Sequence, residues 1–297
     1  MAARRWIFLA ALAAGGCGRA EPATSGLPGG GRIAFVFDRN VSVDRDIMVL
    51  DDDRKDPWAL TSGGGTNESP AWSPEGRTIL FNRNVDGLKA IFSWEDGGEI
   101  ERVCSAPYVD MAPSWSPDGR RFAIMSLRDD NWEIYTMRSD GQEGVRLTED
   151  EADDQWPAWS PSGATLAFVS TRDGDSDLWA MDVETQEVRR LTSDRFIDRR
   201  PAWSPDGSRI AWSSERDGKA AVFVMDADGK NARRLTSPDH ESLDPAWSPD
   251  GRHLVYVGSQ DGYQELYVID ADGKTEPRRV TRLRGTVRTP AWGRRPG

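Results

Sequence analysis

Cysteine and histidine are scarce in this sequence. Its 297 residues include two cysteines, Cys17 and Cys104, and two histidines, His240 and His253. If Cys17 serves in the N-terminal leader described below, Cys104 has no partner for an intrachain disulfide, so packing must stabilise the domain. Two separated imidazoles also offer no ready Ser-His-Asp triad and no three-histidine metal site.

Positive charge is also in short supply. The chain has 38 Lys and Arg against 49 Asp and Glu, which gives a net charge of -11. Nucleic-acid binding depends on clustered Lys and Arg that release counterions, so this composition argues against a nucleic-acid partner. After the N-terminal segment the chain has no apolar run of about 18 residues, which argues against a membrane-spanning helix in that part of the sequence. The composition therefore predicts a globular domain.

The N-terminus has the pattern of an export signal. A basic start, Met1 to Arg5, precedes a nine-residue apolar run, Trp6 to Ala14, and small residues lead to Cys17. This pattern predicts a signal peptide over residues 1–16. The position of Cys17 resembles a bacterial lipobox, so we expect Cys17 to be lipidated, residues 17–30 to form a lipid-anchored tether and the protein to be periplasmic. Ordinary cleavage that leaves a free thiol is the alternative.

A repeated motif occupies the rest of the chain. Pro-Ala-Trp-Ser-Pro-Asp-Gly or a close variant recurs at steps of 43, 44, 44, 44 and 45 residues. This period is typical of one four-stranded blade of a β-propeller. The motif tryptophans are Trp72, Trp115, Trp159, Trp203, Trp247 and Trp292.

Each period contains four short strand-like segments separated by turn residues. In the fifth copy, the turn at residues 248–251 is followed by apolar segments at 253–257 and 265–269. Pro and Gly of the Ser-Pro-Asp-Gly turn supply the fixed and the positive φ angles that a tight turn needs. The copies start at a second strand, at Arg32, and end at a first strand, at Trp292. The sequence therefore predicts an all-β, six-bladed propeller over residues 31–297, with the C-terminal strand completing the first blade.

Two repeat positions have mainly structural interpretations. We expect the six motif tryptophans to fill the wedges between neighbouring blades near the axis, with each indole N–H donating to a backbone carbonyl. Cys104 occupies a position where the other copies have Thr, so it is interpreted as a small buried residue.

These motifs resemble the WD40-like PD40 repeat of TolB-type propellers over residues 32–292. The resemblance implies the propeller fold. It also implies a periplasmic protein that binds partner proteins, although the N-terminal α/β domain of TolB has no counterpart here. Similar repeats form the non-catalytic propellers of prolyl-oligopeptidase-like and tricorn-like peptidases.

The sequence shows no constellation typical of catalysis or of a metal site. It lacks the Gly-x-Ser-x-Gly motif of α/β-hydrolases. Asp173, Asp175 and Asp177 have the spacing of a calcium loop, but Leu178 stands where such a loop needs Gly, and residues 177–181 are expected to form a strand. A pair of carboxylates for glycoside hydrolysis stays open, because the 49 acidic residues allow many pairs.

The loops that precede each first strand differ most between copies, and propellers place recognition in such loops. In a four-stranded blade they open on the same face as the loops between second and third strands. Aromatic, Met and Arg residues there suit a protein or peptide interface, although charged loops could simply keep the domain soluble. The candidate partner-binding residues are Tyr108, Met111, Trp156, Phe196, Arg199 and Arg200.

The sequence as a whole predicts a non-catalytic, protein-binding scaffold of the bacterial envelope. We expect a monomer that needs no cofactor or metal, binds an envelope protein or peptide and meets the membrane only through its lipid. The alternative is an envelope enzyme that acts on a glycan or a small ester in the propeller funnel.

Overall fold

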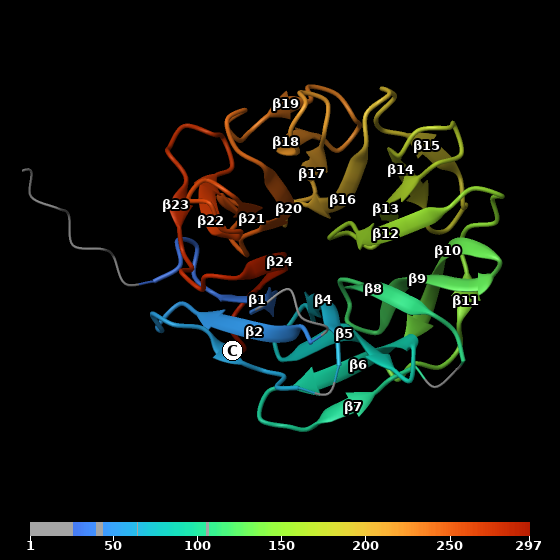
Figure 1. Ribbon diagram of the computed structural model, residues 1–297. Helices are drawn as coiled ribbons and strands as arrows, with labels where there is room; N and C mark the ends of the chain where they lie inside the picture. The colour runs from blue at the N-terminus through green and yellow to red at the C-terminus, as the bar shows by residue number, and fades with distance from the viewer. Residues whose placement is uncertain (1–25, 40–43, 64, 105–106) are drawn as a thin grey trace, which may run out of the picture.

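The computed structural model describes residues 26–39, 44–63, 65–104 and 107–297. Across these residues the chain forms 24 strands in six four-stranded antiparallel sheets, arranged as blades around an axis (Figure 1). The described ranges contain no helix. The predicted all-β, six-bladed propeller is confirmed.

The strands of each blade are numbered here from the axis outward. Blade 1 consists of β24 (Thr286–Gly293), β1 (Arg32–Asp38), β2 (Asp46–Asp51) and β3 (Trp58–Ala59). Blade 2 consists of β4 (Asn67–Trp72), β5 (Thr78–Val85), β6 (Leu88–Glu95) and β7 (Ile100–Arg102). Blade 3 consists of β8 (Asp110–Trp115), β9 (Arg121–Asp129), β10 (Asn131–Arg138) and β11 (Val145–Arg146).

The other three blades follow the same order. Blade 4 consists of β12 (Asp154–Trp159), β13 (Thr165–Ser170), β14 (Asp177–Asp182) and β15 (Val188–Arg190). Blade 5 consists of β16 (Asp198–Trp203), β17 (Arg209–Ser214), β18 (Ala221–Asp226) and β19 (Arg233–Arg234). Blade 6 consists of β20 (Ser242–Trp247), β21 (His253–Gly258), β22 (Glu265–Asp270) and β23 (Arg278–Arg279).

The core lies between neighbouring blades. For example, Ile210 and Trp212 of β17 pack in one cluster with Val169 and Leu178 of blade 4. Middle strands are buried on both faces, so they are apolar nearly throughout, whereas the outer strands are only two or three residues long. Such short outer strands leave little unpaired edge for unwanted pairing.

The motif tryptophans follow the expected arrangement only in part. The indole N–H of Trp203 donates to Ala158 O at 3.2 Å, and that of Trp247 donates to Ala202 O at 3.0 Å, each across a blade boundary. The indole nitrogens of Trp72, Trp115 and Trp159 are buried without a hydrogen-bond partner among the described residues. The expectation that every motif tryptophan finds a carbonyl is therefore wrong for these three.

Cys104 is buried beside Met137, with 3.4 Å between the two sulfur atoms. At the same repeat position, Thr148 and Thr192 accept a hydrogen bond from a backbone N–H of the third strand. Burial raises the pKa of the Cys104 thiol to about 12. The thiol therefore stays protonated at neutral pH and is a poor nucleophile.

The two ends of the described chain close the ring. Strand β24 pairs with β1, with Ile33 opposite Trp292, as the sequence predicts. In blades 2–6 a Ser-Pro-Asp-Gly-type turn joins the first and second strands, and we call the side of the ring with these turns the turn face. Blade 1 lacks this covalent turn, because its first two strands come from opposite ends of the chain.

Residues 26–31 lie where the missing turn would be. Leu27 joins the core cluster between blades 6 and 1, and Gly30 O accepts a hydrogen bond from the Trp292 indole at 2.8 Å. A Cβ atom on Gly31 would lie 2.3 Å from Gly293 O and 3.3 Å from Pro249. The last residues of the expected tether thus pack against the propeller.

The close approach at Gly31 gives a testable expectation. Gly31 and Gly87 have nearly equal φ angles, +87° and +88°, but no atom lies within 4 Å of a Cβ placed on Gly87. Alanine at either position carries the cost of a left-handed conformation, about 1 kcal/mol. Only Gly31→Ala adds the collision with Gly293 O. In urea unfolding, Gly31→Ala should therefore lower the free energy of unfolding by at least about 1 kcal/mol more than Gly87→Ala. Equal losses would show that residues 26–31 are not part of the folded unit.

Candidate functional site

A cavity of 420 Å³ lies on the propeller axis, inside the ring of blades seen in Figure 1. It is lined by the innermost strands of all six blades and by the turns that follow them. Its volume lies in the range of small-ligand sites, about 300–1,000 Å³. Because the same short motif lines it six times, the side chains that differ between copies determine what it can bind.

Each innermost strand carries one residue in the left-handed conformation, directly before the motif proline, at a β-bulge. The φ angles are between 46° and 54°, and the pairing register shifts at this point in every blade. Non-glycine residues with positive φ are strained and concentrate at functional sites. We call these six residues the axial ring: Ser69, Ala112, Trp156, Arg200, Asp244 and Thr289.

The axial ring is asymmetric. Arg200 Nε lies 3.0 Å from Asp244 Oδ1, and the Arg200 guanidinium lies 5.6 Å from the centre of the Trp156 ring. Asp244 Oδ2 accepts a hydrogen bond from the backbone N–H of Thr289 at 3.0 Å. Trp156, Arg200 and Asp244 are partly exposed, whereas Ser69 and the other small members are buried. Blades 4, 5 and 6 therefore supply the side chains that a ligand in the cavity would meet.

The candidate residues from the sequence do not form one cluster. Trp156 and Arg200 come together in the axial ring, at equivalent positions of adjacent blades. Phe196 lies four residues before Arg200, in the loop that precedes β16, under the guanidinium of Arg195. Arg199 pairs with Glu215 at 3.8 Å. Trp156 and Phe196 are therefore not at equivalent positions, because Trp156 belongs to strand β12 and Phe196 precedes strand β16.

Two more candidates lie in or near blade 3. Tyr108 is exposed, and the guanidinium of Arg128 lies 4.6 Å from its ring centre. Met111 belongs to β8 and packs against the core cluster between blades 3 and 4. Tyr108 is thus available to a partner, while Met111 is mainly a packing residue.

The two predicted loop sets do meet on one face, which we call the loop face. Leu127, at the end of a second strand, donates its N–H to Val109 O at 3.0 Å in the loop before a first strand. Five of the seven exposed large hydrophobic side chains among the described residues lie in the connections of this face or at the strand ends beside them: Leu88, Tyr108, Leu127, Ile197 and Tyr263. Sequence reasoning missed Leu88, Leu127, Ile197 and Tyr263. The long hairpin segments of blades 2 and 3 were the available signal for the first two.

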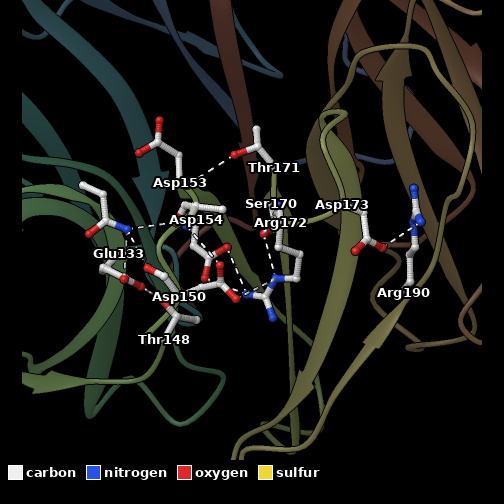
Figure 2. Close-up of polar contacts among 12 residues, drawn as sticks. Glu133, Thr148, Asp150, Asp153, Asp154, Ser170, Thr171, Arg172, Asp173 and Arg190 are labelled. Carbon is white, nitrogen blue, oxygen red and sulfur yellow. Dashed lines mark hydrogen bonds and ion pairs between the residues drawn. The ribbon is translucent and has the colours of Figure 1, made fainter.

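Buried ion pairs hold the loop face in place. Figure 2 shows Arg172 against Asp154, with Nη2 to Oδ2 at 2.8 Å, and its Nε donates to Ser170 Oγ at 2.8 Å. Burial raises the pKa of Asp154, although hydrogen bonds from Ser170 and Arg172 oppose this. The same pairing recurs between Arg128 and Asp110 at 2.9 Å, and between Arg216 and Asp198 at 3.2 Å.

These ion pairs are structural. Each arginine also stacks on aromatic side chains, as Arg172 does on Phe168 and Trp179, at 5.5 and 4.9 Å from the ring centres. Breaking such a buried pair would leave an uncompensated charge. Asn131 donates hydrogen bonds through Nδ2 to the carbonyls of Asp150 and Ala152 at 2.8 and 2.9 Å, which fixes the acidic loop before β12.

The residues weighed for catalysis and for calcium have other partners. Asp173 pairs with Arg190 at 2.7 Å, Asp177 also pairs with Arg190, and Asp177 begins strand β14. His253 lies at the start of β21 on the turn face, 3.4 Å from Asp270. The residues that the structure describes include no group of three or more His, Cys, Asp or Glu side chains placed to hold a metal ion. Within the same ranges, no helix has the length and apolar character to cross a membrane.

Comparison with known proteins places this geometry in a family. The chain is 27% identical to TolB of Acinetobacter baumannii, whose structure superposes with a TM-score of 0.78 over 89% of this chain and 67% of that one. It is 29% identical to the Tol-Pal system protein TolB of Desulfosudis oleivorans over 44% of this chain and 30% of that protein. It is also 36% identical to an uncharacterised peptidase of Bacillus subtilis, YuxL, over 23% of this chain and 10% of that protein.

The curated relatives are longer than the matching regions. Each alignment spans less than a third of the relative's length. The family model described as the TolB beta propeller domain, PD40, matches residues 95–295, which is more than half of the chain. The chain therefore belongs to the TolB beta propeller domain family.

Proposed function

We propose that this protein is a non-catalytic scaffold that binds an envelope protein or peptide on its loop face and at the axial ring. The axial ring carries the proposal. Six equivalent, strained positions have six different side chains, while the scaffold around them repeats. Strain of this kind persists where the surrounding structure enforces it and concentrates where binding needs a fixed backbone.

The composition of the site fits a protein ligand. Trp156 and Arg200 are of the residue types that dominate protein interfaces, and Phe196, Arg199 and Tyr108 lie in or beside the surrounding loops. The exposed hydrophobic side chains on the same face extend the surface beyond the axis. The TolB of Desulfosudis oleivorans is named as a Tol-Pal system protein. This name supports an envelope partner for the present protein.

An enzyme that acts on a glycan or a small ester in the axial cavity is the second candidate. The match to a relative named as a peptidase favours it, although that match covers only 10% of the relative. The cavity carboxylate Asp244 is already engaged by Arg200 and by the Thr289 N–H. The observed contacts therefore favour binding over catalysis.

The proposal includes anchoring through a lipid on Cys17, which lies outside the described residues, and a monomer in the periplasm. Residues 26–31 reach the propeller on the turn face, beside Ser248 and Asp250. The stretch from Cys17 to residue 26 spans at most about 30 Å when fully extended. Such a short tether keeps the turn face near the membrane and directs the loop face away from it.

Removing side chains from the loop face should weaken partner capture. We expect Phe196→Ala and Arg200→Ala each to reduce affinity for the partner by about 1–3 kcal/mol, as truncation of interface anchors does. The matched control is Val188→Ala, because Val188 is 40% exposed on the outer strand β15. The measurement is affinity capture from solubilised envelopes, followed by titration of the captured partner against each variant.

Trp156→Ala needs a separate control, because Trp156 packs against the core clusters on both sides of blade 4. It should weaken capture and also lower stability, so melting curves must accompany its binding data. Normal capture by all three loop-face variants would contradict the proposal. So would loss of capture on Asp118→Ala, in a turn of the opposite face, with the fold intact.

Anchoring is tested at the predicted lipidation site. Cys17→Ser removes the thiol that would carry the lipid, so the protein should move from the membrane fraction to the soluble periplasmic fraction. The propeller should keep its melting temperature, because the described residues contain no disulfide and Cys104 is free. Wild-type protein that is already soluble, with no lipid mass on its N-terminal peptide, would leave only an ordinary signal peptide.

A further inference from the structure

A second concave site lies on the turn face, between blades 4 and 5. Its volume is 490 Å³, and its lining includes the ring of Trp203, the hydroxyl-bearing Ser162 and Thr165, and the charged Arg189 and Asp206. It adjoins the axial cavity, with which it shares Ser160, Pro161, Trp203 and Pro205, but none of the six axial-ring residues lines it.

The repeat itself shows why a groove opens at this boundary. At the next boundary, Arg209 lies over the motif tryptophan of blade 6, with its guanidinium 4.7 Å from the Trp247 ring centre, and Trp247 is only 5% exposed. Arg32 lies over Trp72 at a similar distance, 5.0 Å, although Trp72 stays partly exposed. The equivalent residue of blade 4 is Thr165, which is too short to reach across, and Trp203 stays partly exposed.

A second departure from the repeat enlarges the groove. In blades 3, 5 and 6 the third turn residue is Asp, and it accepts a hydrogen bond from the turn serine, as Asp206 does from Ser204 at 2.6 Å. Blade 4 has Ser162 instead, 3.0 Å from Ser160 Oγ. Blade 4 thus has short hydroxyl side chains at both positions, whereas blade 2, which also has Thr at the first position (Thr78), keeps a carboxylate, Glu75, at the second.

The chemistry of the lining selects the ligand class. A lining that combines an aromatic residue with hydroxyl, carboxylate and guanidinium groups matches a ring-shaped ligand with apolar C–H faces and polar edges. Asp206 stays ionised, because its hydrogen bonds with Ser204 and Ser208 lower its pKa to about 2. Its negative charge and that of the whole chain disfavour an anionic ligand, while Arg189 disfavours a cation.

We propose that the groove between blades 4 and 5 is a binding site for a neutral sugar ring, such as one unit of a glycan chain. The sugar ring stacks on Trp203. Its hydroxyl groups exchange hydrogen bonds with Ser162, Thr165 and Asp206. Arg189, which is held by the carbonyls of Ala227 and Asp228 at 2.9 and 3.3 Å, closes one side. This site does not depend on the partner proposed for the loop face.

The test uses three neutral disaccharides, namely maltose, cellobiose and N,N′-diacetylchitobiose. At least one should give a saturation-transfer NMR signal with the full-length protein, with a Kd of about 1 mM. Thr165→Arg restores the arginine that covers the tryptophan at other boundaries, and Ser162→Asp restores the repeat carboxylate. Each should weaken binding at least about tenfold. Thr78→Arg, at the equivalent position of blade 2, is the matched control and should leave binding unchanged.

Melting curves of the variants show whether a loss of binding comes from a blocked groove or from a damaged fold. Ser162→Asp is the smaller of the two changes and should disturb the fold less. Three results would overturn the proposal. The first is that no disaccharide binds at about 10 mM. The second is that Thr165→Arg and Ser162→Asp bind as the wild type does. The third is that inorganic phosphate displaces the sugar, which would make this an anion site. Partner capture by the Thr165→Arg variant should stay normal. Absence of sugar binding would therefore not contradict the partner binding proposed for the loop face.

Discussion

The pairing of β24 with β1 closes the propeller and holds the first and last blades together. Every core cluster lies between two neighbouring blades, so each blade is stable only while both neighbours are present. The blade that completes the ring is assembled from the two ends of the chain, and Leu27 and Gly31 fill the place of its missing turn. Once the ring is closed, the six innermost strands have fixed positions around the axis.

This closure explains how the axial ring can hold strained residues. A left-handed conformation at Trp156 or Asp244, each directly before a proline, would be unfavourable in a free chain. In the ring it is enforced from outside: the Asp244 N–H, for example, donates to Ser213 Oγ of the preceding blade at 2.9 Å. The scaffold therefore supplies rigidity, and the side chains at the bulges are free to differ. The loop face and the turn face can in this way carry separate binding sites on one repeated framework.

The sequence was sufficient for the fold, because the 44-residue period and the Ser-Pro-Asp-Gly turns specify blade size, blade number and ring closure. It was less informative about the site. Trp156 and Arg200 were recognised as variable residues, but their places in the axial ring depend on a register shift between β-strands that no local pattern reveals. Residues 26–31 have the composition of a flexible linker. They pack where blade 1 lacks a turn between β24 and β1, and this gap exists only after the ring has closed. The groove at Trp203 became visible only when the equivalent positions of neighbouring blades were compared in space.

Recognition on the loop face and at the axial ring can be measured by hydrogen–deuterium exchange of the protein, alone and saturated with its captured partner. Partner binding should slow exchange in residues 152–158, 196–202 and 242–246, which carry the loops and bulges around Trp156, Arg200 and Asp244. Protection confined to the turns at residues 117–120 and 205–208 on the opposite face, with the axial strands unchanged, would contradict it.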